Sequence, residues 1–311
     1  MALVPRPENH RMPRARHRFW VFLWVALAVC TSVGLLNGQE LSGTLKKVHE
    51  TGTVVIGYRE SSIPFSYLNA RGEPIGYSID LGRAVVDAIS NELNGQALKI
   101  KFVPVTSESR IGAVKNGEVD LECGSTTNNT ERQKEVAFSP IMFVAGTKLL
   151  VKRGSPIQSF RDLNGKSVVV TAGTTNESAI RNLTEKFGIQ LNLILAKDHN
   201  ASYELLASGK VDAFAGDDVL LYGFVAVRKA GNDLEVRGDF LSYDPYGIMY
   251  RRDDPELADL VNRVFREMAE SRDLQYTYDR WFLKKLPSGE TLNLPISPQL
   301  DEIFKALGAP D

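Results

Sequence analysis

The sequence predicts an α/β fold with two lobes of similar build, in which two mostly parallel sheets are flanked by helices and joined by two crossing hinge strands. Three observations support this prediction. Strand-like and helix-like segments alternate after residue 51, the same alternation restarts near residue 167, and polar residues follow the end of each matching strand. With 311 residues, of which 43% are hydrophobic, the chain is long enough for two compact units.

The first lobe is predicted from three strand-like runs and one helical stretch. "TVVIGYR" (53–59), "LKIKFVPV" (98–105) and "VDLECG" (119–124) have the β-branched composition of strands. "IDLGRAVVDAISNEL" (79–93) has apolar residues at helical spacing. An order of strand, helix and strand indicates a mostly parallel sheet, because parallel strands need a crossover connection.

The second lobe repeats this order. "SVVVTAGTT" (167–175) predicts a strand that runs into a loop, with a helix from Glu177. "LNLILAK" (191–197) and "VDAFAG" (211–216) predict two further strands, and "SYELLASG" (202–209) predicts a helix between them.

The two halves also align residue by residue. "NGEVDLECGS" (116–125) matches "SGKVDAFAGD" (208–217) at a constant offset, which places Ser125 opposite Asp217. Loops after the carboxyl ends of the strands should therefore face each other across a cleft, where open α/β sheets bind ligands.

Two extended segments, 143–155 and 243–254, are interpreted as the hinge strands through which the chain leaves the first lobe and returns to it. The run 255–282 has helical spacing and should pack back on the first lobe, followed by a Pro-rich tail over the surface. The expected boundaries are a leader over 1–38, lobe 1 over 43–145, lobe 2 over 146–243, and a return to lobe 1 with the tail over 244–311.

The amino terminus has the pattern of an exported protein. Arg11, Arg14, Arg16 and Arg18 precede an apolar run from Phe19 to Leu36, as in a secretory signal peptide. The run is long, so an uncleaved membrane anchor is the alternative. Cys30 raises the question of a lipoprotein, but Val29 stands where a small residue is expected.

Composition excludes several classes of function. A net charge of -1, without a basic tract beyond the leader, argues against a nucleic-acid surface. One cysteine, Cys123, remains after the leader, so no internal disulfide is expected. Only His199 lies well inside the folded part, which argues against a histidine metal cluster and leaves a catalytic triad one candidate base. We expect no metal and no cofactor.

"ECGSTTNNTERQK" (122–134) is suited to hold an anion. Small hydroxyl residues are good helix N-caps, and Arg132 offers a planar fork for a carboxylate or phosphate. The hypothesis is an anion held at a helix N-terminus. The alternative is an ordinary N-cap, with Arg132 on a solvated helix face.

The predicted architecture brings one set of polar residues into the cleft. The candidates are Arg59, Arg110, Ser125, Thr127, Arg132, Thr174, Thr175, His199 and Asp217. Three arginines and a histidine against one aspartate would match two carboxylates and one ammonium, as in an acidic amino acid. Taken singly, each has an ordinary interpretation, such as a surface ion pair for Arg59 or helix caps for Thr174, Thr175 and Asp217.

These residues carry a resemblance to the family 3 periplasmic solute-binding proteins of bacterial ABC importers. The similar stretch runs from about residue 43 to 285 and includes "GYRESSIPFSY", "GYSIDLGRAVVDA", "ECGSTTNNTERQ", "GTTNE", "AKDH" and "GDD". The resemblance implies the type II periplasmic-binding-protein fold and a receptor without enzymatic activity. It also implies ABC permease membrane subunits with a cytoplasmic ATPase as partners, and we expect a monomer.

The resemblance assigns roles to the matching positions. It implies that Thr127, Arg132 and Thr175, with Thr174 beside them, hold an α-carboxylate, and that Ser125 and Asp217 take the α-ammonium. In the acidic-amino-acid branch, Arg59, Arg110 and His199 would receive the side-chain carboxylate of L-glutamate or L-aspartate. Two positions depart from the pattern, Tyr58 where His is expected and Gly216 where a larger residue is usual.

Two other functions are kept as alternatives. Some proteins that resemble this family are periplasmic dehydratases, and Glu122 and Glu131 are candidate acids for such chemistry, although the inferred pocket offers no apolar slot for a ring. A ligand-binding sensor domain, anchored by an uncleaved leader, is the second alternative.

Overall fold

The structure is a computed structural model that describes residues 1–4 and 41–309. The chain separates into two units, Met1–Leu41 and Ser42–Asp311, and the helices and sheets of the described residues belong to the second. The arginines and the apolar run of the predicted leader lie outside the described residues. Within the described ranges, no helix combines the length and apolar character needed to cross a membrane.

One five-stranded sheet defines the first lobe, called lobe 1. Its strands, in spatial order, are β5 (Lys99–Pro104), β1 (Thr53–Tyr58), β6 (Leu121–Cys123), β15 (Met249–Arg251) and β7 (Val136–Phe138). The first three run parallel, while β15 is antiparallel to both of its neighbours. A small sheet stands beside it, formed by β2 (Ser61–Ser62), β3 (Ser66–Leu68) and β4 (Pro74–Ile75).

Helices from both ends of the chain complete lobe 1. They are α2 (Gly43–Thr51), α3 (Tyr77–Glu92), α4 (Arg110–Lys115), α8 (Pro255–Glu270), α9 (Asp273–Phe282) and α10 (Pro298–Leu307). The carboxyl-terminal α8 packs on α2, α3 and α10.

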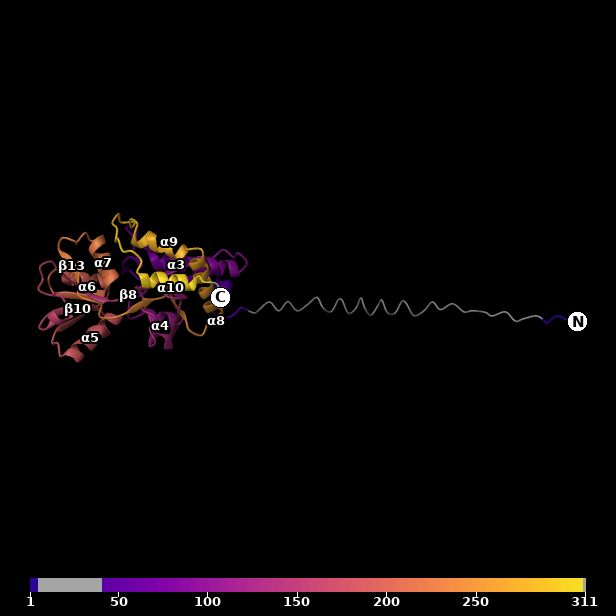
Figure 1. Cartoon of the computed structure of the whole chain (residues 1–311), viewed down its shortest axis with the longest axis horizontal. Coiled ribbons are helices and arrows are strands. Elements are labelled where there is room, and N and C mark those ends of the chain that lie inside the picture. Colours follow the sequence, from indigo (N-terminus) through magenta and orange to yellow (C-terminus); the bar gives the residue numbers. More distant parts are fainter. Residues whose placement is uncertain (5–40, 310–311) are drawn as a thin grey trace. The chain divides into compact units, whose positions relative to one another are not determined.

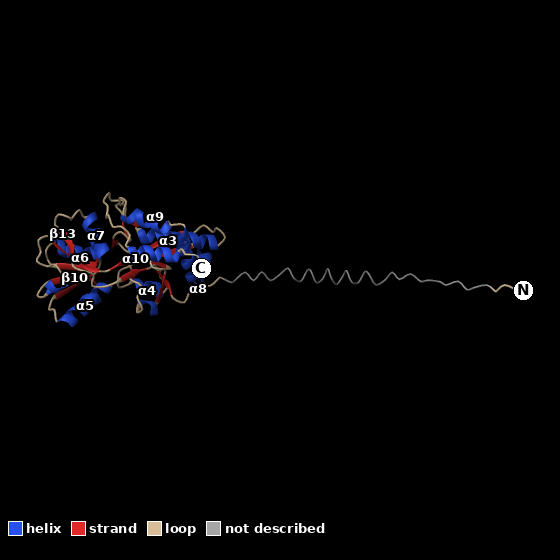
Figure 2. Ribbon diagram, viewed as in Figure 1, coloured by secondary structure: helices blue, strands red, loops and turns tan. Residues whose placement is uncertain are grey.

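A second five-stranded sheet with the same arrangement defines lobe 2. Its strands are β11 (Asn192–Ala196), β10 (Ser167–Thr171), β12 (Ala213–Asp217), β9 (Thr147–Lys152) and β13 (Leu234–Arg237). The first three are again parallel and β9 is antiparallel to both neighbours. Helices α5 (Thr175–Phe187), α6 (His199–Ala207) and α7 (Asp218–Val227) pack against this sheet. The matching strand orders confirm the internal repeat, and Figure 2 shows the strands lying among helices.

The two hinge segments meet as a short ladder of their own. β8 (Phe143–Ala145) pairs antiparallel with β14 (Asp244–Tyr246), and β9 and β15 continue from them into the two main sheets. Figure 1 places β8 between the group of α5, α6 and α7 and the group of α3, α8 and α9. Phe143 and Tyr246 pack in an aromatic cluster with Phe65, which anchors the hinge ladder to lobe 1.

The core follows from burial on both faces of the sheets. Strand β12 is buried at all five positions, and the central residues of β10 are fully buried valines, as expected for parallel strands covered by helices on both sides. In lobe 2 the core includes Leu149, Val168 and Ile180.

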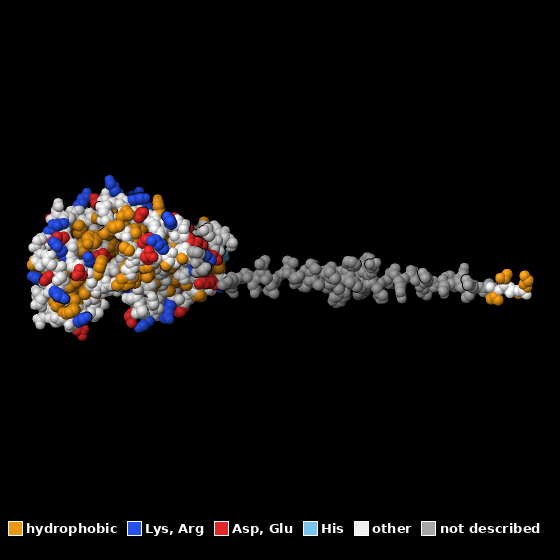
Figure 3. Space-filling view, viewed as in Figure 1, with side chains coloured by type: hydrophobic (Ala, Val, Ile, Leu, Met, Phe, Trp, Pro, Cys, Tyr) orange, Lys and Arg blue, Asp and Glu red, His pale blue; other side chains and the backbone are white. Residues whose placement is uncertain are grey.

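On the visible face, basic and acidic side chains are interspersed, in keeping with the near-neutral net charge (Figure 3).

Four sequence-based predictions of local structure need correction. The helix expected from Glu177 begins at Thr175, because Thr174 is its N-cap, and the helix expected over 202–209 begins at His199, because the Asp198 side chain caps it. The run over 255–282 is two helices, separated where Arg272 adopts a left-handed φ of 67°. The tail ends in α10, which Ser297 caps.

Candidate functional site

The candidate residues lie at the carboxyl ends of the parallel strands in both lobes. Arg59 follows β1 and Ser125 follows β6, whereas Gly173 and Thr174 follow β10 and Asp217 ends β12. Since parallel strands end at the same edge of a sheet, these loops gather on one side of each lobe.

Arg59 is buried at the end of β1, with 2% of its surface exposed. Its backbone N–H donates to Ser66 Oγ at 2.9 Å, and Nη2 donates to Ser107 Oγ at 2.7 Å. Its Nη1 is buried without a partner among the described residues. The surface ion pair considered from the sequence is therefore wrong for Arg59.

Arg110 is equally buried, at the first position of α4. Its Nη1 donates to Thr126 Oγ1 at 2.6 Å, and its Nε is buried without a partner in the described part of the chain. Burial lowers the pKa of Arg110. Burial, with repulsion from Arg110, lowers the pKa of Arg59 to about 9, so Arg59 remains protonated at neutral pH.

Glu122 is the buried counter-charge to these arginines. It is fully buried on β6, and its Oε2 accepts from Thr126 Oγ1 at 2.7 Å, while Oε1 has no partner among the described residues. Through Thr126, Glu122 is thus linked to Arg110. Its negative charge raises the pKa of both Arg59 and Arg110 against the effect of burial.

Gly124 is required by this packing. A Cβ at Gly124 would lie 2.2 Å from Glu122 Oε1 and 2.8 Å from Arg59 Cγ, which is closer than carbon and oxygen atoms pack. The absence of a side chain at Gly124 therefore lets Glu122 and Arg59 occupy neighbouring positions.

The loop after β6 is not the start of a helix, so the predicted helix N-terminus at Ser125–Thr127 is wrong. Thr127 forms an isolated bridge with Tyr246, and only a three-residue 3-10 turn, Arg132–Lys134, follows. Pairing with the hinge strand keeps the backbone extended where the local sequence favours a cap. A helix dipole therefore plays no part in anion binding at this loop.

Arg132 nevertheless points inward. It is 9% exposed, which excludes the solvated-face alternative, and Nη1 donates to Thr127 O at 2.9 Å. Its Nη2 approaches Gly173 O of lobe 2 at 3.5 Å. Burial, with repulsion from Arg110, lowers the pKa of Arg132 to about 9, so this guanidinium is also charged at neutral pH.

Two threonines join the lobes beside Arg132. Thr127 Oγ1 and Thr175 Oγ1 lie 3.2 Å apart, and Thr127 also donates to Asp244 Oδ1 at 3.3 Å. Thr174 plays a different part: its hydroxyl donates to Thr171 O at 2.7 Å and caps α5. The Thr174 hydroxyl therefore stabilises the start of α5, as the helix-cap interpretation expected.

Asp217 is buried at the amino end of α7 but does not cap it. Its Oδ1 accepts from Asn176 Nδ2 at 2.8 Å, and its Oδ2 accepts from the Tyr246 hydroxyl. Burial, with repulsion from Asp244, raises the pKa of Asp217 to about 7. A cation near Asp217 would favour its ionised form.

His199 and Ser125 complete the set. His199 is 3% exposed, and its Nδ1 lies 2.9 Å from Thr171 Oγ1. Burial, reinforced by Arg59 and Arg110, holds the pKa of His199 well below its usual range, so the ring is neutral at pH 7. Ser125 Oγ donates to Ser62 Oγ at 3.1 Å.

The structure adds residues that the sequence did not assign to the site. They are Ser107, Thr126, Asn176, Asp244 and Tyr246, together with Glu122 in the role of counter-charge rather than acid catalyst. Asn176 follows the "GTT" loop directly and Thr126 lies between two predicted site residues, so proximity to a motif was a usable signal for both. Tyr246 comes from the distant hinge and carried no such signal.

The site as a whole is strongly cationic and largely closed to water. Arg59, Arg110 and Arg132 form no ion pair with a carboxylate among the described residues. Buried charges are costly unless they are paired. The unpartnered nitrogens of Arg59 and Arg110 therefore favour an anionic ligand, while Asp217 favours a cationic group on the other side.

Comparison with known proteins identifies the class. The sequence profile of the bacterial extracellular solute-binding proteins, family 3, matches residues 54–284. An L-glutamate/L-aspartate-binding protein of Pseudomonas aeruginosa is 46% identical over 268 residues, covering 86% of this chain and 89% of that protein. A glutamate/aspartate import solute-binding protein of Salmonella typhimurium is 40% identical over 285 residues, covering 90% and 94%.

Solved structures agree on the fold. An ancestral arginine-binding protein bound to glutamine has a TM-score of 0.68 and 28% identity, covering 75% of this chain and 99% of that one. An ancestral amino acid-binding protein, a precursor of cyclohexadienyl dehydratase, has a TM-score of 0.67 and 30% identity, covering 77% and 99%.

The chain therefore belongs to the family 3 bacterial extracellular solute-binding proteins and has their two-lobed, type II fold. Its similarity to import solute-binding proteins over most of their length favours a receptor for ABC import over an enzyme.

Proposed function

We propose that this protein binds L-glutamate or L-aspartate between its two lobes and delivers it to the membrane permease of an ABC importer, whose cytoplasmic ATPase drives transport. The observation that carries the proposal is a pair of buried guanidinium nitrogens, one on Arg59 and one on Arg110, that have no hydrogen-bond partner in the described part of the chain. An acidic side chain would satisfy both, because a carboxylate accepts several charge-assisted hydrogen bonds at once. The names of the similar import proteins support the same ligands.

The α-carboxylate is assigned to the face where the lobes touch. Arg132 supplies the charge, and Thr127 and Thr175 supply hydroxyls from opposite lobes. A ligand bound at this face would contact both lobes, so it would shift the population toward the closed form.

The α-ammonium is assigned to Asp217 and Ser125. Asp217 already accepts hydrogen bonds from Asn176 and Tyr246, which fix the orientation of its carboxylate. His199 lies on the side of Arg59 and Arg110, where the neutral ring would offer a hydrogen bond without adding charge.

The remaining assignments are also part of the proposal. Lobe 1 comprises 43–145 and 244–311, and lobe 2 comprises 146–243, a division supported by the β8–β14 ladder at both crossings. The leader over 1–38 is cleaved on export to the periplasm, and the mature protein is a monomer.

The proposal is tested by calorimetric titration of leaderless protein that has been stripped of carried-over ligand. Glutamate and aspartate should bind tightly with one-to-one stoichiometry, while glutamine, which lacks the second carboxylate, should bind much more weakly. Prephenate serves as the dehydratase substrate. Binding or turnover of prephenate, with no heat from either acidic amino acid, would overturn the proposal.

A further inference from the structure

Gly223 of lobe 2 lies against the backbone of lobe 1. It is a buried residue in the middle of α7, and a Cβ built on it would lie 2.5 Å from the carbonyl oxygen of Ile63 and 3.1 Å from the carbonyl carbon. Carbon does not approach a carbonyl oxygen this closely, and the obstacle is backbone rather than a flexible side chain. Any side chain at Gly223 would therefore have to move the two lobes apart.

The backbone of α7 does not itself require a glycine at this position. The φ of Gly223 is not in the left-handed region, and glycine in a helix interior costs about 1 kcal/mol relative to alanine. The close approach of Ile63 is thus the feature that accounts for the glycine.

The contact lies between two ligand-binding elements. Ile63 follows Ser62, whose hydroxyl bonds to Ser125 at 3.1 Å, while α7 begins directly after Asp217. The separation of Ile63 and Gly223 therefore governs the separation of Ser125 and Asp217, which are the two residues assigned to the ligand's ammonium.

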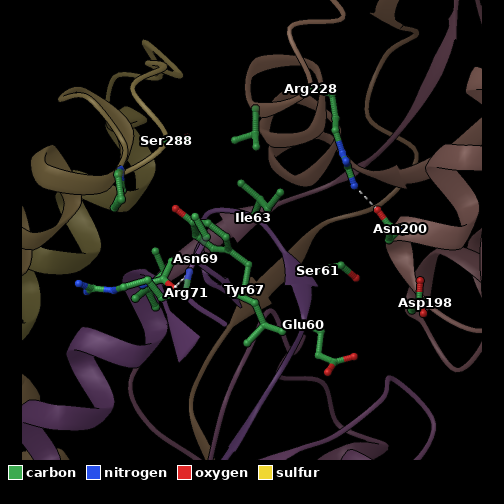
Figure 4. A pocket seen from close by; sticks show the side chains of 15 residues that line it. Glu60, Ser61, Ile63, Tyr67, Asn69, Arg71, Asp198, Asn200, Arg228 and Ser288 are labelled. Atoms are coloured by element: carbon green, nitrogen blue, oxygen red, sulfur yellow. Dashed lines mark hydrogen bonds between the residues drawn. The ribbon is translucent and has the colours of Figure 1, made fainter. Parts of the chain in front are cut away.

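A pocket of about 660 Å³ opens beside this contact and is lined by both lobes. Figure 4 shows Ile63 and Tyr67 from lobe 1, and Asn200 and Arg228 from lobe 2, with a hydrogen bond between the latter two. The lobes thus diverge next to the glycine, so the backbone contact is a local point of closest approach rather than part of a continuous interface.

A second glycine makes a similar contact near Arg132. A Cβ at Gly173 of lobe 2 would lie 2.8 Å from Glu108 Cγ and 3.0 Å from Glu108 Cα of lobe 1. Gly173 has a φ of 72°, so any substitution there would also strain its own backbone. A substitution at Gly223 would change the contact between the lobes without straining the backbone of Gly223 itself.

We propose that Gly223 sets how closely the two lobes approach and so determines affinity without touching the ligand. The identity of the ligand in this inference rests on the proposed function, whereas the contact between Gly223 and Ile63 does not. A larger residue at this position reduces the fraction of protein that reaches the closed form, and apparent affinity falls in proportion to that fraction.

The first test is Gly223→Ala, titrated with glutamate and aspartate. We expect both dissociation constants to rise by the same factor, roughly tenfold or more, since closure is common to all ligands. The melting temperature of the ligand-free variant should be equal to or above that of the parent, because alanine favours the helix. Gly112→Ala is the matched control: Gly112 is also helical, but a Cβ there meets nothing within 4 Å, so affinity should not change.

A second test needs no ligand. Thr127→Cys together with Thr175→Cys places two thiols at positions whose hydroxyls are 3.2 Å apart across the lobes, while Cys123 is fully buried. Oxidised glutathione should form the interlobe disulfide more slowly when Gly223→Ala is added, and at the parent rate when Gly112→Ala is added.

The outcomes separate the two proposals. If the parent protein binds neither acidic amino acid, the proposed function fails, and the disulfide rate still decides the role of Gly223. If Gly223→Ala leaves both the dissociation constants and the disulfide rate unchanged, the inference about Gly223 is overturned while the proposed function stands.

Discussion

Thr127 and Thr175 bring their hydroxyl oxygens within 3.2 Å of each other, although one follows a strand of lobe 1 and the other begins a helix of lobe 2. This contact, with Arg132 approaching Gly173 O on the same side, shows lobes that touch through the residues assigned to the α-carboxylate. Arg59, Arg110 and His199 are assigned to the part of the ligand that differs between amino acids. In the proposed assignment, the site divides into a part that would bind any amino acid and a part that would select acidic side chains.

Removal of Arg110 should reduce the selectivity for acidic ligands. We expect Arg110→Ala to weaken glutamate binding by about 1.5–3 kcal/mol, which is the usual contribution of a hydrogen bond to a charged group, and to weaken glutamine binding much less. Competition titrations with both ligands measure the difference. Arg181→Ala removes an exposed arginine on α5 and should change neither affinity. Equal losses for glutamate and glutamine in Arg110→Ala would contradict the assignment of Arg110.

Removal of Arg132 should weaken the binding of all amino acids alike, without changing the selectivity between them. Because every amino acid carries an α-carboxylate, Arg132→Ala should weaken glutamate, aspartate and glutamine by a common factor, again about 1.5–3 kcal/mol. The ratio of their dissociation constants would then stay near that of the parent protein. Undiminished glutamate binding by Arg132→Ala would remove the loop after β6 from the site.

Affinity should increase with pH through the titration of Asp217. The pKa of about 7 in the ligand-free protein means that Asp217 is mostly protonated at pH 6 and mostly ionised at pH 8, and only the ionised form pairs with an ammonium. The dissociation constant should therefore fall roughly tenfold from pH 6 to pH 8. Calorimetry in buffers of different ionisation enthalpy should show proton release on binding at pH 6.5. Asp217→Asn should bind weakly and without this pH dependence.

The raised pKa of Asp217 should also make the stability of the ligand-free protein fall as pH rises. The unfolded pKa of an aspartate is about 3.9, so between about pH 4 and pH 7 the folded protein binds more protons at Asp217 than the unfolded chain does. The contribution of Asp217 to the free energy of unfolding of the ligand-free protein is therefore lost as pH rises through this window. Urea denaturation at pH 5 and pH 8 should show a smaller pH effect in Asp217→Asn than in the parent.

Glu122 should matter more for the ligand-free protein than for the complex. Glu122→Gln keeps the shape of the side chain and its acceptor for Thr126, but leaves three buried guanidiniums without this counter-charge. We expect a loss of stability on the order of 3 kcal/mol without ligand. Glutamate should restore part of it, so the rise in melting temperature on binding should exceed that of the parent. An unchanged melting temperature in the ligand-free variant would show that Glu122 does not compensate the arginines.

The class of fold, the internal repeat and most members of the proposed site follow from the order of the amino acids. Local patterns suffice for these, since β-branched runs and helical spacing recur in the same order, and parallel strands place their following loops at one edge. Arg59, Arg110 and Asp217 could be found in this way because each stands next to the end of a predicted strand or at the start of a helix.

The contacts of these residues depend on how distant segments of the chain pack against each other. The segment after β6 has the composition of a helix start, yet its pairing with the hinge strand at Tyr246 holds it extended. Tyr246 meets Asp217 only because two crossovers bring the hinge against lobe 2, and Gly223 matters only because Ile63 lies against it. Such contacts join residues far apart along the chain, and their geometry follows from how the two lobes pack rather than from any local preference.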